Sequence, residues 1–204
     1  MSIPVVDPYP LPDPGDLPRG RVSWRVDPAR AVLLVHDMQR HFLRYYTPGT
    51  SPLDPVLKAI DELRSRAADL GVPVIFSAQP GGQTPAQRGL QQEMWGDGVG
   101  AGAPSDVVVE LQPGETLMPK WRYNAFHRTS LASLMGTRDQ LVICGVYAHI
   151  GIAATAADAF MRDIQAFVVA DAVADFSRAD HDAALARIAD HCGVVLPAAE
   201  VFAA

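Results

Sequence analysis

The sequence has few cysteines, no excess of positive charge and no long apolar run. Its 204 residues include only two cysteines, Cys144 and Cys192, which argues against a disulfide-stapled fold and a cysteine-rich zinc site. The formal net charge is −6 at pH 7, so no broad basic face is expected for nucleic acid or a membrane. No apolar run approaches the ~20 residues of a membrane span, and no secretory signal begins the chain. We therefore expect a cytoplasmic protein, for which a small anionic ligand stays possible.

Proline and acidic residues are concentrated at the start, where residues 1–20 predict an extended arm lying over the surface. From Ala31 onward, short apolar runs alternate with segments of helical periodicity, which is typical of β-α-β units. We expect one domain, 1–204, with a three-layer α/β/α Rossmann-like fold around a six-stranded, mainly parallel sheet. The expected strands are 31–35, 72–76, 116–119, 140–144, 166–170 and 193–197, and the expected helices are 54–70, 129–136, 152–163 and 179–192.

One long segment, 80–105, breaks this alternation and is rich in Gly, Pro and Gln. Long loops in compact domains are usually functional or disordered. Because the segment carries Arg88 and Trp95, we favour a functional loop.

Polar and aromatic side chains follow four of the predicted strands. Asp37, Gln79, Lys120 and Tyr147 each come shortly after an apolar run. Ligands of open α/β sheets bind outside the carboxyl ends of the strands, so these side chains predict a site at one rim. Each also has a structural interpretation, since an Asp after a strand is often a helix cap and a lone Lys or Gln is often solvated. Asp171 and Asp175, near the fifth run, are interpreted as caps or loop anchors.

Several longer motifs occur in a fixed order along nearly the whole chain: LLVHDMQRHF, SAQPG, QRGLQQEMWG, KWRYNAFHRTSL, GVYAHIG and DAFMRDIQAFVVADAVADFS. Together they resemble the isochorismatase branch of the cysteine-hydrolase-like superfamily. Within that branch the resemblance is greatest to the stand-alone enzymes of the phenazine pathway and to the isochorismatase domain of siderophore synthesis. The chain ends at Ala204, so no carrier-protein domain is expected after it.

The resemblance implies catalytic positions. In the wider superfamily the set is Asp, Lys and Cys, and the motifs match the first two to Asp37 and Lys120. The cysteine position falls on Gly151, and a glycine cannot form a covalent acyl intermediate. Cys144 lies seven residues earlier in a predicted strand and does not replace it. A thiol-dependent amidohydrolase is therefore disfavoured, and the Asp/His cluster of metal-binding relatives is also not found.

The isochorismatase branch acts on enol ethers, namely isochorismate or 2-amino-2-deoxyisochorismate. Protonation of the terminal methylene carbon gives an oxocarbenium ion, water adds, and the hemiketal collapses to pyruvate and the ring alcohol. This chemistry needs no metal or cofactor. The resemblance makes Asp37 the general acid, which a bound substrate carboxylate would help to stay protonated while recruiting Lys120. Gly151 is expected to leave room for the substrate and to offer its backbone N–H.

The same resemblance implies substrate contacts. Arg88 suits a carboxylate because its guanidinium pairs bidentately, while Trp95 would close the pocket and Phe42 would form an apolar wall. Core packing is the alternative for the two aromatic residues, and His36 and His149 are interpreted as loop histidines without a catalytic role. The full set of expected contacts is Gln79, Arg88, Trp95, Tyr147 and Phe42.

Three questions stay open at this point. The rival to the hydrolase is an inactive relative that serves as a scaffold or carrier-protein partner. The motifs do not decide between the two substrates, although the absence of a carrier domain favours the amino compound. A homodimer or larger homo-oligomer is expected from the family.

Overall fold

A computed structural model describes residues 3–101 and 106–203. Its centre is one six-stranded sheet with the order β3-β2-β1-β4-β5-β6, in which every neighbouring pair is parallel. The predicted fold class is confirmed, and the sheet is parallel throughout rather than mainly. The strands are β1 (Ala31–His36), β2 (Val74–Ala78), β3 (Thr116–Pro119), β4 (Gln140–Val146), β5 (Gln165–Ala174) and β6 (Gly193–Leu196).

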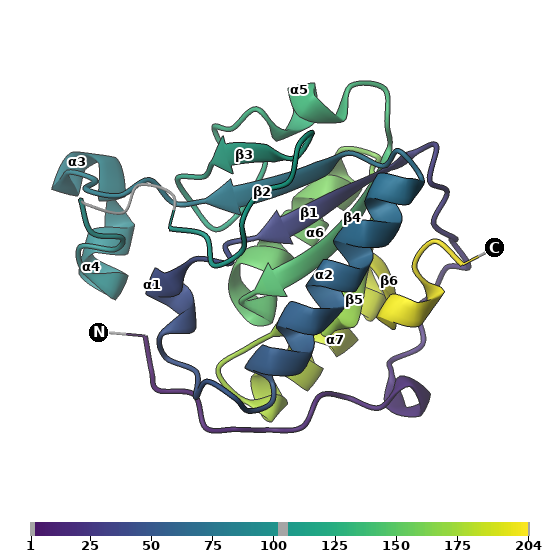
Figure 1. Cartoon of the computed structure of the whole chain (residues 1–204), viewed down its shortest axis with the longest axis horizontal. Helices are drawn as coiled ribbons and strands as arrows, with labels where there is room; N and C mark the ends of the chain where they lie inside the picture. Colours follow the sequence, from purple (N-terminus) through teal and green to yellow (C-terminus); the bar gives the residue numbers. More distant parts are fainter. Residues whose placement is uncertain (1–2, 102–105, 204) are drawn as a thin grey trace.

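Helices cover both faces of the sheet. The long helix α2 lies over one face, and α6 and α7 lie over the other (Figure 1). None of the described helices is both long and apolar enough to cross a membrane. The helices are α1 (Arg40–Leu43), α2 (Leu53–Asp69), α3 (Pro85–Arg88), α4 (Leu90–Trp95), α5 (Leu131–Met135), α6 (Ala153–Met161) and α7 (Arg178–His191).

The alternation of side chains along the strands builds two separate cores. In β1, Leu33 and Val35 face the α2 side, whereas Val32 and Leu34 face α6 and α7. Successive side chains of a strand point to opposite faces, so a strand covered on both faces must be apolar at every position. This is why the predicted strands read as continuous apolar runs.

Two predicted features differ from the structure. The strand β3 is an edge strand with only one covered face, since Met118 is buried whereas Leu117, on the opposite face, is 38% exposed. The segment 80–105 is not a plain loop. Its described part contains the short helices α3 and α4, and residues 102–105 lie outside the described range.

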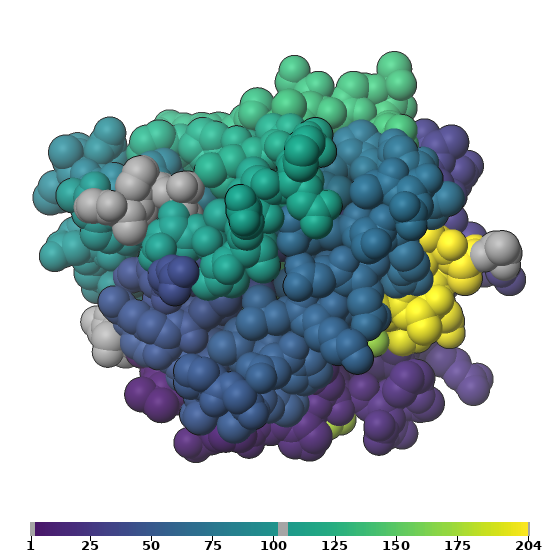
Figure 2. Space-filling model, in the orientation of Figure 1, coloured from purple at the N-terminus to yellow at the C-terminus, as the bar shows by residue number. Residues whose placement is uncertain are grey.

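The predicted N-terminal arm is extended over its described residues, apart from one 3-10 turn at Pro14–Asp16. Its first two residues lie outside the described range. Backbone hydrogen bonds from Val6 to Tyr45 and from Tyr9 to Ser51 hold it against the segment before α2. Figure 2 shows the arm, in purple, packed along the edge of the blue surface.

A buried ion pair ties α2 to the turn before β3. Arg64 donates two hydrogen bonds of 2.7 Å to Glu115, and both side chains are less than a tenth exposed. In Glu115→Gln the buried guanidinium of Arg64 keeps the exposed carboxylate of Asp61 but loses its buried one, so the free energy of unfolding should fall by about 2 kcal/mol. Urea denaturation measures the change. The matched control is Glu62→Gln, which breaks the exposed pair with Lys58 and should cost at most ~0.5 kcal/mol. Equal losses in the two variants would contradict this prediction.

Candidate active site

A cavity opens at the carboxyl ends of the central strands, which is where open α/β sheets bind small ligands. Asp37, Gln79, Lys120 and Tyr147 reach it from the ends of β1, β2, β3 and β4, which are neighbours in the sheet. All eight residues expected from the sequence line this one cavity: Asp37, Phe42, Gln79, Arg88, Trp95, Lys120, Tyr147 and Gly151.

Asp37 is the first residue beyond β1 and has an unusual backbone. Its φ of 51° lies in the left-handed region, which costs free energy for a residue with a side chain and is concentrated at functional sites. Ser77 holds it there. The backbone N–H of Asp37 donates to the carbonyl and hydroxyl oxygens of Ser77, and the hydroxyl donates to Asp37 Oδ1 at 2.7 Å. Asp37 is therefore not a helix cap, and its side chain is aimed by the end of β2.

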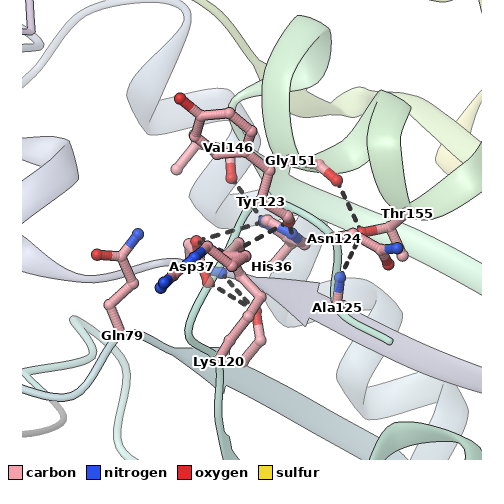
Figure 3. A network of polar contacts seen from close by, with 12 residues as sticks. His36, Asp37, Gln79, Lys120, Tyr123, Asn124, Ala125, Val146, Gly151 and Thr155 are labelled. Atoms are coloured by element: carbon pink, nitrogen blue, oxygen red, sulfur yellow. Dashed lines mark hydrogen bonds and ion pairs between the residues drawn. The ribbon is translucent and has the colours of Figure 1, made fainter. Parts of the chain in front are cut away.

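Lys120 is fully buried and contacts Asp37 directly. Its Nζ lies 2.8 Å from Asp37 Oδ2, 2.6 Å from the carbonyl of Arg122 and 3.3 Å from that of Tyr123 (Figure 3). An ammonium has three donors, and here all three have acceptors. Lys120 is thus not the solvated lysine of the structural interpretation. It could bind a substrate carboxylate only by releasing one of these acceptors.

His36 fills the space beside Gly151. A Cβ built on Gly151 would lie 2.2 Å from Cε1 of the His36 ring. The expectation that Gly151 leaves room for the substrate is therefore wrong at this point, because the imidazole already takes the place of its missing side chain. The ring is held by Val146, whose carbonyl lies 2.8 Å from Nδ1. The other ring nitrogen, Nε2, lies 3.3 Å from the carbonyl of Tyr123, and burial lowers the pKa of His36 with partial opposition from the Asp37 charge.

The segment GVYAHIG is also more regular than predicted. Residues Ala148–Ile152 form a π-helical turn that runs into α6, and such turns are frequent at functional sites. Thr155 fixes this turn against the chain beyond Lys120. Its hydroxyl donates to the carbonyl of Gly151 at 2.7 Å and accepts from the N–H of Ala125 at 2.9 Å (Figure 3).

Arg88 and Gln79 form a second polar group in the cavity wall. Arg88 Nη1 donates to Gln79 Oε1 at 3.0 Å, and its Nε donates to the carbonyl of Gly96. Gln39 fixes Gln79 in turn, since its side-chain amide bonds to both the N–H and the carbonyl of Gln79. A buried guanidinium oriented this way can receive an anionic group.

The aromatic residues of the wall have structural contacts as well. Phe42 is buried in the core that includes α2, so both of its sequence interpretations hold in part. Tyr147 donates its hydroxyl to the carbonyl of Phe42 at 2.6 Å, which leaves mainly its ring for a ligand. Trp95 donates its indole N–H to the hydroxyl of Tyr123 and borders the cavity with Phe176.

The remaining residues of the lining were not expected as site residues: Ile3, His36, His41, Gln91, Tyr123, Val146, Ile150 and Phe176. Two of them carried a usable signal. Gln91 precedes Trp95 by four residues on α4, which is the spacing of one helical face. Tyr123 lies three residues after Lys120. No local sequence pattern indicates that Ile3, which lies on the N-terminal arm, lines the cavity.

Asp171 and Asp175 are loop anchors. Asp171 accepts from the backbone N–H of Ala198 at 2.7 Å, and Asp175 accepts from those of His149 and Phe176. The ring of His149 also lies 2.5 Å from Asp175, outside the cavity lining. His149 thus lies in the π-helical turn and not in a loop, its partner is the buried carboxylate of Asp175, and its lack of a catalytic role stays a prediction.

The His149–Asp175 contact predicts a pH dependence of stability. The hydrogen bond to Asp175 raises the pKa of His149 above its usual 6.5. The stabilisation is therefore complete below about pH 6.5 and is lost as pH rises through the folded-state value. His149→Gln should lower Tm more at about pH 5.5 than at about pH 9, whereas His127→Gln, at an exposed position, should show no such difference. A pH-independent effect of His149→Gln, read by thermal denaturation, would contradict this assignment.

The thiols of the chain do not replace a nucleophile at Gly151. Cys144 is fully buried in β4, where it contacts the carbonyl of Leu34, and burial raises the pKa of its thiol. A buried, protonated thiol is inert. Within residues 3–101 and 106–203, no three His, Cys, Asp or Glu side chains are grouped so that they could hold a metal ion.

Comparison with known proteins gives the family of this site. The model of the isochorismatase domain matches residues 31–200. The chain belongs to the isochorismatase family. This isochorismatase-family protein is 46% identical over 205 residues to the phenazine biosynthesis protein PhzD of Pseudomonas fluorescens, covering 98% of each chain. It is 46% identical over 197 residues to the isochorismatase of Bacillus subtilis and covers 63% of that longer protein. It is 42% identical to the enterobactin synthase component B of Escherichia coli and covers 73% of it.

Solved structures share the fold of this family member at lower sequence identity. A cysteine hydrolase from Pseudomonas syringae pv. phaseolicola superposes with a TM-score of 0.78 at 24% identity, covering 91% of this chain and 95% of that one. N-carbamoylsarcosine amidase from Thermoplasma acidophilum superposes with a TM-score of 0.72 at 22% identity, covering 85% and 99%. At these identities the likeness extends to the fold alone.

Proposed function

We propose that this protein hydrolyses the enolpyruvyl ether of isochorismate or of 2-amino-2-deoxyisochorismate, in the biosynthesis of a secondary metabolite or siderophore. The observation that carries the proposal is the buried Asp37–Lys120 pair in a largely apolar cavity that has no nucleophile at position 151. The names of the relatives, among them an isochorismatase and a phenazine biosynthesis protein, support it.

Asp37 acts as the general acid in this proposal. Ser77 occupies Oδ1, so the proton to be delivered sits on Oδ2, the oxygen that Lys120 contacts in the free protein. A substrate carboxylate draws the ammonium of Lys120 away from Oδ2 and brings a negative charge near Asp37. Both effects favour the protonated acid. Because Lys120 exchanges Asp37 for the substrate carboxylate, substrate binding is coupled to the protonation of Asp37.

The reaction then follows from the placement of one acid. Asp37 protonates the terminal methylene carbon, and the resulting oxocarbenium ion lies among apolar and aromatic side chains near the regenerated carboxylate. A water molecule adds to the cationic carbon and returns a proton to Asp37. The hemiketal transfers its hydroxyl proton to the ether oxygen attached to the ring and separates into pyruvate and the ring alcohol. Arg88, oriented by Gln79, holds a substrate carboxylate throughout.

Pyruvate release tests the proposal. The protein is supplied with isochorismate and, separately, with 2-amino-2-deoxyisochorismate, and pyruvate is followed by coupling to lactate dehydrogenase. The expected result is turnover of at least one substrate, and the ratio of the two kcat/KM values identifies the preferred one. Absence of pyruvate from both substrates, with a folded protein, would favour an inactive scaffold or carrier-protein partner instead.

The wider setting is part of the same proposal. The site residues gather around one end of a single sheet, and the family match spans 31–200, which supports a single catalytic domain. Two free thiols suit the reducing cytoplasm. Leu134, Phe160 and Met161 are exposed on α5 and α6 and would suit a contact between subunits of a homo-oligomer, whose mass light scattering would measure.

A further inference from the structure

Helix α4 reverses the usual placement of polar and apolar side chains. Gln91 is only 6% exposed, whereas its neighbour Leu90 is 81% exposed. A helix that packs for stability alone would bury the leucine and expose the glutamine. Gln91 is the buried residue of α4, and it lines the cavity together with Arg88 and Trp95.

The amide of Gln91 also has an unused acceptor. Its Oε1 is buried, and no hydrogen bond among the described residues reaches it. Such an atom costs stability, which is a reason to look for a ligand group that completes it.

The other side-chain oxygens of the cavity wall are already engaged. Asp37 accepts from Ser77 and Lys120, and Gln79 accepts from Arg88. Gln91 Oε1 is thus a cavity acceptor that lacks a donor, in a wall whose two cations, Arg88 and Lys120, suit negatively charged groups.

The chemistry of the proposed substrates identifies the missing donor. Their two ionised carboxylates and the ether oxygen can only accept hydrogen bonds. The one donor on isochorismate is its ring 2-hydroxyl, and the one donor on the other substrate is its 2-amino group. This is the position at which the two substrates differ.

We propose that Gln91 accepts a hydrogen bond from the ring 2-substituent and thereby takes part in choosing between the two substrates. The inference rests on the function proposed above. A hydrogen bond from an ammonium is stronger than one from a hydroxyl, so Gln91 contributes more to binding the 2-amino substrate. Because the 2-substituent takes no part in bond cleavage, the contribution lies in KM rather than in kcat.

The test uses the full chain with Gln91→Leu and, as matched control, Gln92→Leu. Gln92 is the next residue of the same helix, and its side chain bonds to Asp97 outside the cavity lining. Pyruvate release is measured on both substrates. Gln91→Leu should raise KM about tenfold or more for the better substrate, with kcat changed less than twofold, while Gln92→Leu leaves both constants within twofold. Gln91→Glu should raise the ratio of kcat/KM for the amino over the hydroxy substrate.

Thermal denaturation shows whether Gln91 contributes to substrate recognition or only to the stability of the fold. Gln91→Leu replaces an unsatisfied buried amide with an apolar group, so its Tm should equal or exceed that of the unaltered protein even as KM rises. Unchanged kcat/KM values in Gln91→Leu would overturn this inference alone, whether Tm falls or not. Absence of pyruvate from the unaltered protein would remove the proposed function, and this inference with it.

Discussion

Asp37→Asn should lower kcat for pyruvate release by about a thousandfold, because a general acid typically contributes 10²–10⁴ to the rate. Asparagine has the same shape and can still contact Ser77 and Lys120, but it has no proton to give to carbon. The coupled lactate dehydrogenase assay measures the change on both substrates. Asp171→Asn is the matched control, since Asp171 anchors Ala198 outside the cavity and its loss should leave kcat unchanged.

Loss of activity in Asp37→Asn could also follow from a misfolded site, because the buried ammonium of Lys120 then lacks its anion. The double variant Asp37→Asn/Lys120→Met addresses this. It removes both charges, so it should regain Tm relative to Asp37→Asn while remaining inactive. Retention of more than a tenth of the original kcat in Asp37→Asn would show that another group supplies the proton.

Gly151→Ala is expected to have the second large effect. The new methyl group would lie 2.2 Å from the His36 ring, which is itself enclosed on all sides, so ring or backbone must move. Overpacking of this kind costs about 1–3 kcal/mol of stability, and here it also displaces the residue next to Asp37. We expect a fall of at least ~100-fold in kcat/KM, since small displacements of catalytic groups have effects of that order. Urea denaturation and the pyruvate assay measure the two losses.

Two control variants test whether the effect comes from the contact between the new methyl group and His36. Gly15→Ala adds a methyl group with no atom within 4 Å and should change neither stability nor activity. In Gly151→Ala/His36→Ala the imidazole is gone, so part of the lost stability should return. If the double variant is no more stable than the sum of the single losses predicts, His36 is not what opposes the methyl group. Gly151→Cys meets the same ring and should not create a thiol-dependent amidase.

Most of the fold could be predicted because it depends on local patterns. Strands covered on both faces are apolar at every position, so all six runs were identified, with ends shifted by up to four residues. The pattern of β3 is the weakest of the six, because only one face of this strand is buried. The helices α1, α3 and α4 lie outside the predicted helices, because none of them reaches the two turns over which a periodic pattern can be recognised. The helix α5 is as short, but it lies inside the predicted segment 129–136.

The site was predictable to the extent that it follows strand ends and motifs. Asp37 and Lys120 come directly after β1 and β3, and parallel strands bring their carboxyl ends to one rim. What the sequence could not show are contacts between distant segments. The ring of His36 against Gly151, and the direct pairing of Lys120 with Asp37 in the free protein, depend on how β1, β3 and β4 are spaced in the sheet.

The N-terminal arm has a practical consequence for anyone producing this protein. Ile3 borders the cavity, and the described ends of the chain lie on opposite sides of the molecule (Figure 1). An affinity tag or fusion partner on the amino-terminal side of Ile3 would lie close to the site in sequence, where it could obstruct substrate entry or shift the arm. The described carboxy-terminal end lies on the opposite side of the molecule (Figure 1). Kinetic constants from amino-terminally tagged material should therefore be compared with those of tag-free or carboxy-terminally tagged protein before they are attributed to the enzyme itself.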